Sequence, residues 1–109
     1  MRKLMLPATV MILLGVNAGA QDAAKGAEVY AAQKCSMCHA IGGKGNAKGP
    51  LDSVGTKLSA DEIRQWIVDP AAMATKTKAV RKPPMPAKYS SLPKSDLDAL
   101  VAYMSSLKK

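Results

Sequence analysis

Apolar residues recur at helical intervals in three stretches of the chain, whereas no stretch alternates apolar and polar residues as a half-buried strand does. The first stretch begins after Asp22, a residue type that caps helices, and continues as AAKGAEVYAAQK to residue 34. Gly26 and Tyr30 lie four residues apart within it, and therefore on one helical face. We predict a first helix that ends just before the cysteines of the chain.

The second and third predicted helices carry their own start signals. Ser59 and Glu62 have the spacing of a capping box, and the Asp-Pro pair at positions 69–70 is expected to stop the second helix. The third helix is expected to begin at Ser95, with Asp98 three residues further on. The apolar stripes are Ile63, Trp66 and Ile67 in the second helix and Leu97, Leu100, Val101, Met104 and Leu107 in the third.

The segments between these helices are rich in glycine, proline and lysine. Residues 41–50, IGGKGNAKGP, are expected to form a flexible loop without an ordered element. Residues 75–93, TKTKAVRKPPMPAKYSSLP, contain prolines that exclude a helix and favour extended backbone around Met85. The sequence therefore predicts a stiff, extended proline strap (residues 83–86, PPMP) with one thioether in it.

Residues 1–20, MRKLMLPATVMILLGVNAGA, have the layout of a secretory signal peptide. Two basic residues precede an apolar run over residues 4–16, and small residues follow it. This run is shorter than the roughly 20 residues that cross a bilayer, which favours cleavage after Ala20 over retention as an N-terminal anchor. We expect an exported protein, periplasmic in a bacterium, with its functional domain at residues 21–109 and no stable membrane insertion once the leader is cleaved.

The expected domain at residues 21–109 is small and basic. Removing Arg2 and Lys3 from the 16 basic side chains leaves 14 against 8 acidic ones, a net charge of +6. Its 89 residues include no Phe and one Trp, and at this size an apolar core alone is marginal. A disulfide, a metal or a cofactor is therefore expected to complete the core.

Both cysteines and the single histidine lie within five consecutive residues of the segment KCSMCHAIG, as Cys35, Cys38 and His39. A structural zinc site normally uses four Cys or His ligands, and the chain has three. A thiol redox pair is expected beside a βαβ unit, which this sequence does not predict, and a structural disulfide would close too short a loop to stabilise much. The Cys-x-x-Cys-His order favours the fourth alternative, attachment of a c-type haem.

The spacing of these residues suits haem attachment. Two thiols three residues apart can each reach one of two neighbouring vinyl groups on a porphyrin edge and form a thioether, while the adjacent imidazole coordinates the iron. A covalent haem also explains the scarcity of aromatic residues, because an apolar disc replaces core side chains. The sequence predicts one haem c per chain, with its iron, attached at Cys35 and Cys38 and ligated by His39.

From residue 22 to residue 107 the chain resembles the class I cytochromes c, and CSMCH carries the resemblance most specifically. The resemblance implies an all-α small cytochrome c fold, with short helices and loops wrapped around one haem. PPMP resembles the segment that delivers the second axial ligand, here Met85. GPLD at 49–52 resembles the loop whose proline carbonyl, here Pro50, accepts a hydrogen bond from the ligating imidazole, and Trp66 resembles the family's donor to a haem propionate.

The resemblance also implies that the first and last helices cross, with Gly26 and Tyr30 against Leu100 and Tyr103. The roles suggested for the tryptophan and for the methionines also have simpler alternatives. An indole on an apolar stripe is by default a core residue, and methionines outside the proline strap are more often core fillers than ligands: Met37, Met73 and Met104.

A haem iron with histidine and methionine as axial ligands has no open coordination position, which indicates a single-electron carrier and not an enzyme. We expect the protein to serve exported or membrane-bound redox partners. Two alternatives stay open: a haem-containing subunit of an oxidoreductase, for example in sulfur-compound oxidation, and a haem sensor with an open distal site. No second histidine is present for acid–base work at such a site.

Basic residues flank both the attachment motif and the proline strap, and no carboxylate lies between residues 69 and 96. This pattern favours docking of acidic redox-partner proteins, although a solvated surface is the ordinary role of such lysines. Nucleic-acid binding is not expected, because no aromatic stacking platform accompanies the charge. The basic residues concerned are Lys34, Lys44, Lys48, Lys76, Lys78, Arg81, Lys82 and Lys88.

Overall fold

The computed structural model describes residues 18–80 and 83–109. In chain order its elements are α1 (Ala18–Ala32), the 3-10 helix η1 (Cys35–Met37), strands β1 (Ala40–Ile41) and β2 (Lys44–Gly45), α2 (Val54–Lys57), α3 (Ala60–Val68), α4 (Pro70–Thr77), the 3-10 helix η2 (Ala87–Ser91) and α5 (Lys94–Ser105). This mostly helical architecture confirms the predicted all-α class. Residues 1–17, most of the predicted leader, lie outside the described residues, and no described helix is long and apolar enough to span a membrane.

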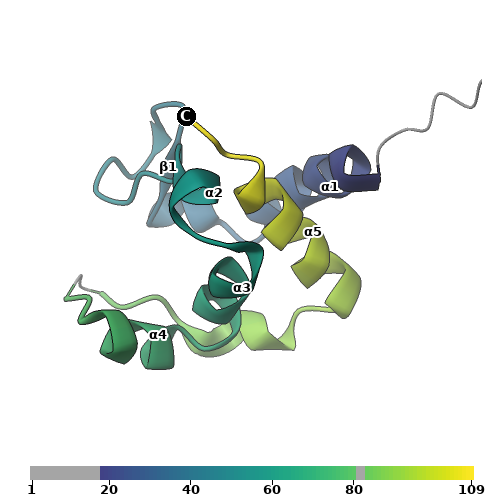
Figure 1. Cartoon of the computed structure of the whole chain (residues 1–109). Helices are drawn as coiled ribbons and strands as arrows, with labels where there is room; N and C mark the ends of the chain where they lie inside the picture. Colours follow the sequence, from purple (N-terminus) through teal and green to yellow (C-terminus); the bar gives the residue numbers. More distant parts are fainter. Residues whose placement is uncertain (1–17, 81–82) are drawn as a thin grey trace, which may run out of the picture.

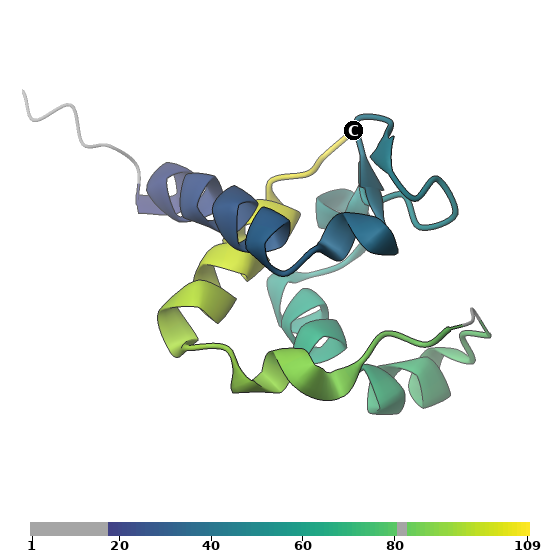
Figure 2. The ribbon, with the colours of Figure 1, turned by 180° about the vertical axis from the view of Figure 1, so that it is seen from behind.

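The first and last helices cross at Gly26, where α1 and α5 lie side by side (Figures 1 and 2). A Cβ at Gly26 would collide with the backbone carbonyl of Ala99, so the glycine lets the two helix backbones touch. One turn further along α1, the ring of Tyr30 meets that of Tyr103 edge to face, with centroids 5.8 Å apart and planes at 67°. The predicted crossing of these helices is confirmed.

The apolar stripes predicted for the second and third helices form one side of the core. Ile63 and Ile67 of α3 are buried, as are three residues of the α5 stripe, while Trp66, Leu97 and Leu107 are half-buried. The main cluster also takes residues from α1 and η2. Its buried members are Val29, Tyr30, Ile63, Ile67, Tyr89, Leu100, Val101 and Met104.

The capping box at the start of α3 forms as predicted. The Glu62 N–H donates to Ser59 Oγ at 3.2 Å, and the Ser59 N–H donates to Glu62 Oε1 at 3.1 Å. Both bonds connect residues three apart, so the signal is fully local and could be recognised from the sequence.

The predicted starts of the other two helices are wrong. α1 begins at Ala18 and not after Asp22, because alanines before that residue continue the helix. α5 begins at Lys94, with Pro93 in the capping position and no side-chain cap, so Ser95 lies inside the helix. The fixed φ of the proline, −52°, already suits the entry into a helix.

An unpredicted helix, α4, follows α3 directly. Asp69 and Pro70 end α3 as expected, but the Asp69 carboxylate then accepts a hydrogen bond from the Ala72 N–H at 3.2 Å. Proline is well suited to the first helical position, because its missing N–H would have no intrahelical partner there. Met73 therefore lies on a helix and is buried, with 4% of its surface exposed.

The glycine-rich segment after the attachment motif is also more ordered than predicted. β1 and β2 form a short antiparallel hairpin that pairs Ala40 with Gly45 and Ile41 with Lys44. Gly42 and Gly43, at φ values of 59° and 79°, make the two-residue turn. Glycine adopts these angles at little cost, so the Gly-Gly pair was a hairpin signal within what was expected to be a flexible loop.

Candidate functional site

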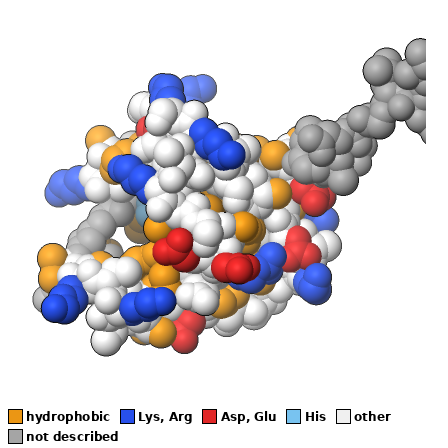
Figure 3. Space-filling view, viewed as in Figure 1, with side chains coloured by type: hydrophobic (Ala, Val, Ile, Leu, Met, Phe, Trp, Pro, Cys, Tyr) orange, Lys and Arg blue, Asp and Glu red, His pale blue; other side chains and the backbone are white. Residues whose placement is uncertain are grey.

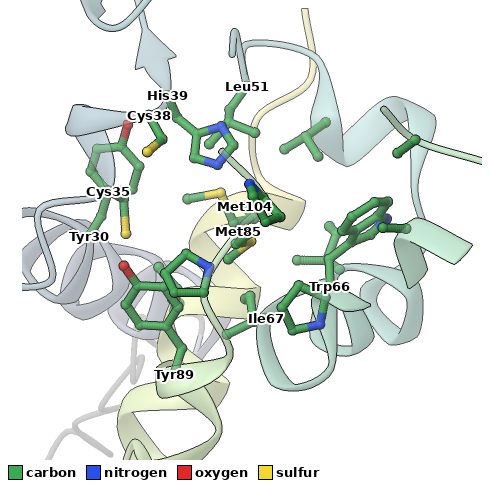
Figure 4. A pocket seen from close by; sticks show the side chains of 18 of the residues that line it. Tyr30, Cys35, Cys38, His39, Leu51, Trp66, Ile67, Met85, Tyr89 and Met104 are labelled. Carbon is green, nitrogen blue, oxygen red and sulfur yellow. The ribbon is translucent and has the colours of Figure 1, made fainter. Parts of the chain in front are cut away.

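A largely apolar cavity of about 510 Å³ occupies the centre of the fold (Figure 4). Helices α3 and α4, the proline strap, η2 and the attachment motif all contribute to its walls. Its volume lies in the range of about 300–1,000 Å³ that is usual for ligand and cofactor sites. Of the six predicted site residues, five line this cavity: Cys35, Cys38, His39, Trp66 and Met85.

The attachment motif enters the cavity wall through a tight turn. Lys34 has a φ of 56°, a left-handed conformation that leads the chain from α1 into η1. The N–H groups of Cys38 and His39 then both donate to the carbonyl of Cys35, at 3.1 and 3.0 Å. This short helix brings two thiols and one imidazole to the same wall. The two thiols are half-buried and not joined by a disulfide, and burial raises the pKa of the Cys35 thiol.

The imidazole of His39 is oriented by a backbone carbonyl, but not by the predicted one. Its Nδ1 lies 3.1 Å from the carbonyl oxygen of Gly49, which also accepts the Ala40 N–H at 3.0 Å. The prediction named Pro50, which is exposed and does not line the cavity. Pro50 forms a parallel bridge with Ala40, and successive carbonyls of an extended chain point to opposite sides, so the Pro50 carbonyl is directed away from residue 40. With Nδ1 as donor, the ring's lone pair lies on Nε2.

Two methionines bring thioethers to the cavity. Met85 is half-buried in the proline strap, and Met104 is buried on α5 with 6% of its surface exposed. Figure 4 shows both side chains among those that line the cavity together with His39. Met73, in contrast, is not among the described residues that line the cavity.

The cytochrome c family model matches residues 23–108, most of the chain. The chain belongs to the cytochrome c family. It is 34% identical over 93 residues to cytochrome c oxidase subunit 2 of Alkalihalophilus pseudofirmus, in a match that covers 77% of this chain and 25% of that protein. This cytochrome c thus spans about a quarter of the length of that relative. No solved structure shows a significant match to it.

Cytochromes c bind haem c, and the residues of this cytochrome c fit that cofactor. The cavity joins apolar walls to thiols, an imidazole and thioethers, the groups that attach haem c and ligate its iron. Tyr30 lines the cavity, and its hydroxyl is buried without a hydrogen-bond partner among the described residues. Burial, and then the proximity of Cys35, raises the pKa of Tyr30 to about 12. A buried polar atom left without a partner is costly, so the Tyr30 hydroxyl is an unfavourable feature of this core.

Two further aromatic residues shape the cavity of this cytochrome c. Trp66 lines it from α3 and is half-buried, a placement that core packing also explains, so its contact with a propionate stays a prediction. Tyr89 was missed: it is 9% exposed, lines the cavity from η2, and has a pKa raised chiefly by burial. The Lys88 ammonium lies 5.3 Å from the centroid of its ring. Tyr89 follows the proline strap in a segment with no helical period, so no pattern marked it as buried.

The basic residues named from the sequence lie at the surface of this cytochrome c. Lys34 lines the cavity and is exposed, and five further lysines are exposed: Lys44, Lys48, Lys76, Lys78 and Lys88. Arg81 and Lys82 lie outside the described residues. Figure 3 shows basic side chains around the hollow on the left of the view, whereas acidic side chains gather mainly at the centre and right of the view.

Proposed function

We propose that this cytochrome c is a single-electron carrier in which Cys35 and Cys38 hold haem c through thioethers and His39 and Met85 ligate its iron. The observation that supports this most is the convergence of two thiols, one imidazole and the strap thioether on one apolar cavity. When bound, haem c supplies an iron that alternates between ferrous and ferric states. The domain's own residues would hold that iron, set its reduction potential and keep water out of the cavity.

Each residue has a separate part in this proposal. The Gly49 carbonyl orients the imidazole of His39 and raises its basicity through Nδ1. The soft thioether of Met85 favours ferrous iron and so raises the reduction potential. The apolar lining would exclude water, and Trp66 would donate its indole N–H to a propionate. His39 and Met85 would together hold the iron, which would leave no position on it for a substrate.

Carbon monoxide binding by the reduced, haem-loaded full chain tests the proposal. We expect no change in the Soret band on adding carbon monoxide at neutral pH, because His39 and Met85 both occupy the iron. Rapid formation of a carbon monoxide complex would instead support an open distal position, as a haem sensor or an enzyme requires.

A second candidate follows from the similarity to a cytochrome c oxidase subunit 2. The domain would then pass electrons as part of a larger oxidoreductase, with the same ligands and the same one-electron chemistry. Copurification separates the two: a carrier is expected to leave a gently solubilised oxidoreductase at moderate salt, whereas a subunit stays with it.

The exposed lysines support a proposal about partners. Lys34 lines the cavity, and the ammonium of Lys88 lies over the ring of Tyr89, which also lines it. Further exposed lysines lie on β2 and α4. We propose that this basic surface docks acidic redox-partner proteins near the haem edge. A positive patch of this kind accelerates encounter without needing a large interface.

Electron exchange with an acidic partner is accordingly expected to slow strongly as salt rises, because charges are screened beyond roughly 8 Å at physiological ionic strength. Stopped-flow rates over a salt series measure this, with a neutral small-molecule oxidant as the control whose rate stays nearly constant. A flat dependence with the protein partner would mean that the lysines are ordinary solvated surface.

We also propose that residues 1–20 export the chain, to the periplasm in a bacterium, and are then removed. The basic start, the short apolar run and the small residues before Gln21 support this. The intact mass of the exported protein decides between cleavage after Ala20 and a retained anchor.

A further inference from the structure

The backbone at the end of β2 runs directly against the attachment motif. Gly45 has a φ of 111°, and a Cβ there would collide with the carbonyl of His39. The next residue, Asn46, donates its backbone N–H to the carbonyls of both Ser36 and His39, at 3.1 and 3.0 Å. Its side-chain Nδ2 donates to the carbonyl of Met37 at 3.2 Å. One residue therefore donates to three carbonyls of the segment that carries both cysteines and the histidine.

The remaining polar atoms of Asn46 close a turn over residues 46–49. Its Oδ1 accepts the Lys48 N–H at 3.0 Å, and its carbonyl accepts the Gly49 N–H at 3.1 Å. The carbonyl of Gly49, at the end of this turn, is the group that lies 3.1 Å from Nδ1 of His39. Asn46 thus connects the attachment motif on one side with the orienting carbonyl on the other.

We propose that Asn46 is a positioning residue that sets the hydrogen bond between His39 and Gly49, and through it the electron donation of the imidazole to the iron. The inference rests on the proposed role of His39 as an iron ligand. A hydrogen bond from Nδ1 raises the basicity of the imidazole, which favours ferric iron. Loosening the turn weakens that bond, so the reduction potential rises.

The experiment uses the haem-loaded full chain and three variants. Asn46→Ala removes both side-chain bonds. Asn46→Ser keeps an oxygen that can accept the Lys48 N–H but is too short to reach Met37, so it tests the contribution of the bond to the Met37 carbonyl alone. It is also a milder variant, for use if alanine impairs maturation. Ser59→Ala is the control, because it removes the capping box of α3, away from the turn, and lowers stability without touching His39.

Two quantities are measured beside the melting temperature: the solvent-exchange rate of the His39 Nδ1–H by NMR of the ferrous protein, and the reduction potential. For Asn46→Ala we expect exchange to quicken roughly tenfold, the equivalent of one ordinary hydrogen bond, and the potential to become more positive. Asn46→Ser should shift both in the same direction by less. Ser59→Ala should lower the melting temperature and leave both unchanged.

The inference is overturned if either quantity stays at the wild-type value in both Asn46 variants, even when their melting temperatures fall, because Asn46 would then be a structural residue only. Failure of the proposed function is recognised separately in the wild-type protein. There, His39 ring protons shifted far upfield by the haem ring current establish axial ligation, and their absence would contradict the role of His39 itself.

Discussion

Replacing Met85 with alanine is expected to open the iron to carbon monoxide, abolish the near-infrared band of thioether-bound ferric haem and lower the reduction potential. The fall should be on the order of 0.1 V, a part of the roughly 0.8 V that axial ligands span. Met85 is suited to ligation because the prolines on both sides restrict the strap before the iron binds, so less conformational entropy is lost. Its side chain is half-buried and lines the cavity with His39.

Two other methionines provide matched controls. Met73→Ala should leave all three properties unchanged, although it lowers stability by roughly 2–5 kcal/mol because the side chain is buried on α4. Met104→Leu is the sharper control, since Met104 lines the same cavity and the change nearly conserves volume, at a cost below about 1.5 kcal/mol. Loss of the near-infrared band in either control, with retention in Met85→Ala, would show that the assignment of Met85 is wrong.

What the sequence predicted well depends on contacts that are close in the chain. The cysteines and the histidine lie within five residues, so one turn of 3-10 helix is enough to bring them to one wall. The capping box at Ser59 is equally local. The crossing of α1 and α5 joins distant residues, but a glycine one turn before an aromatic residue is a signal that the family resemblance made interpretable.

The missed features depend on the direction of backbone groups or on signals with two meanings. Asp69 and Pro70 both end one helix and start the next, whereas the prediction treated them only as a stop signal. The choice of Gly49 over Pro50 as the carbonyl for His39 follows from the parallel bridge to Ala40, which no residue pattern encodes. The sequence did not indicate a role for Asn46 either, because the groups to which it donates are backbone carbonyls, which no residue pattern identifies.

The chain is also expected to stay largely unfolded when it is expressed without residues 1–20 in a compartment that lacks haem-attachment machinery. The cavity of about 510 Å³ would then lie empty at the centre of the core. The apolar side chains of its walls would then face water, which costs roughly 25 cal/mol per Å² of apolar surface left exposed. Typical domains have only about 5–15 kcal/mol of stability in total, and one this small is marginal even when well packed.

Scanning calorimetry and far-UV circular dichroism of the haem-free chain measure this, with the exported, haem-loaded protein as the reference that shows one cooperative transition. An exported Cys35→Ala, Cys38→Ala double variant is the matched control for the leader, because it keeps the export route and removes only the attachment points. It should be as unfolded as the chain expressed without the leader. A cooperative thermal transition in the haem-free chain would mean that the walls of the cavity collapse onto one another and that the core of helices α1, α3 and α5 is sufficient for folding.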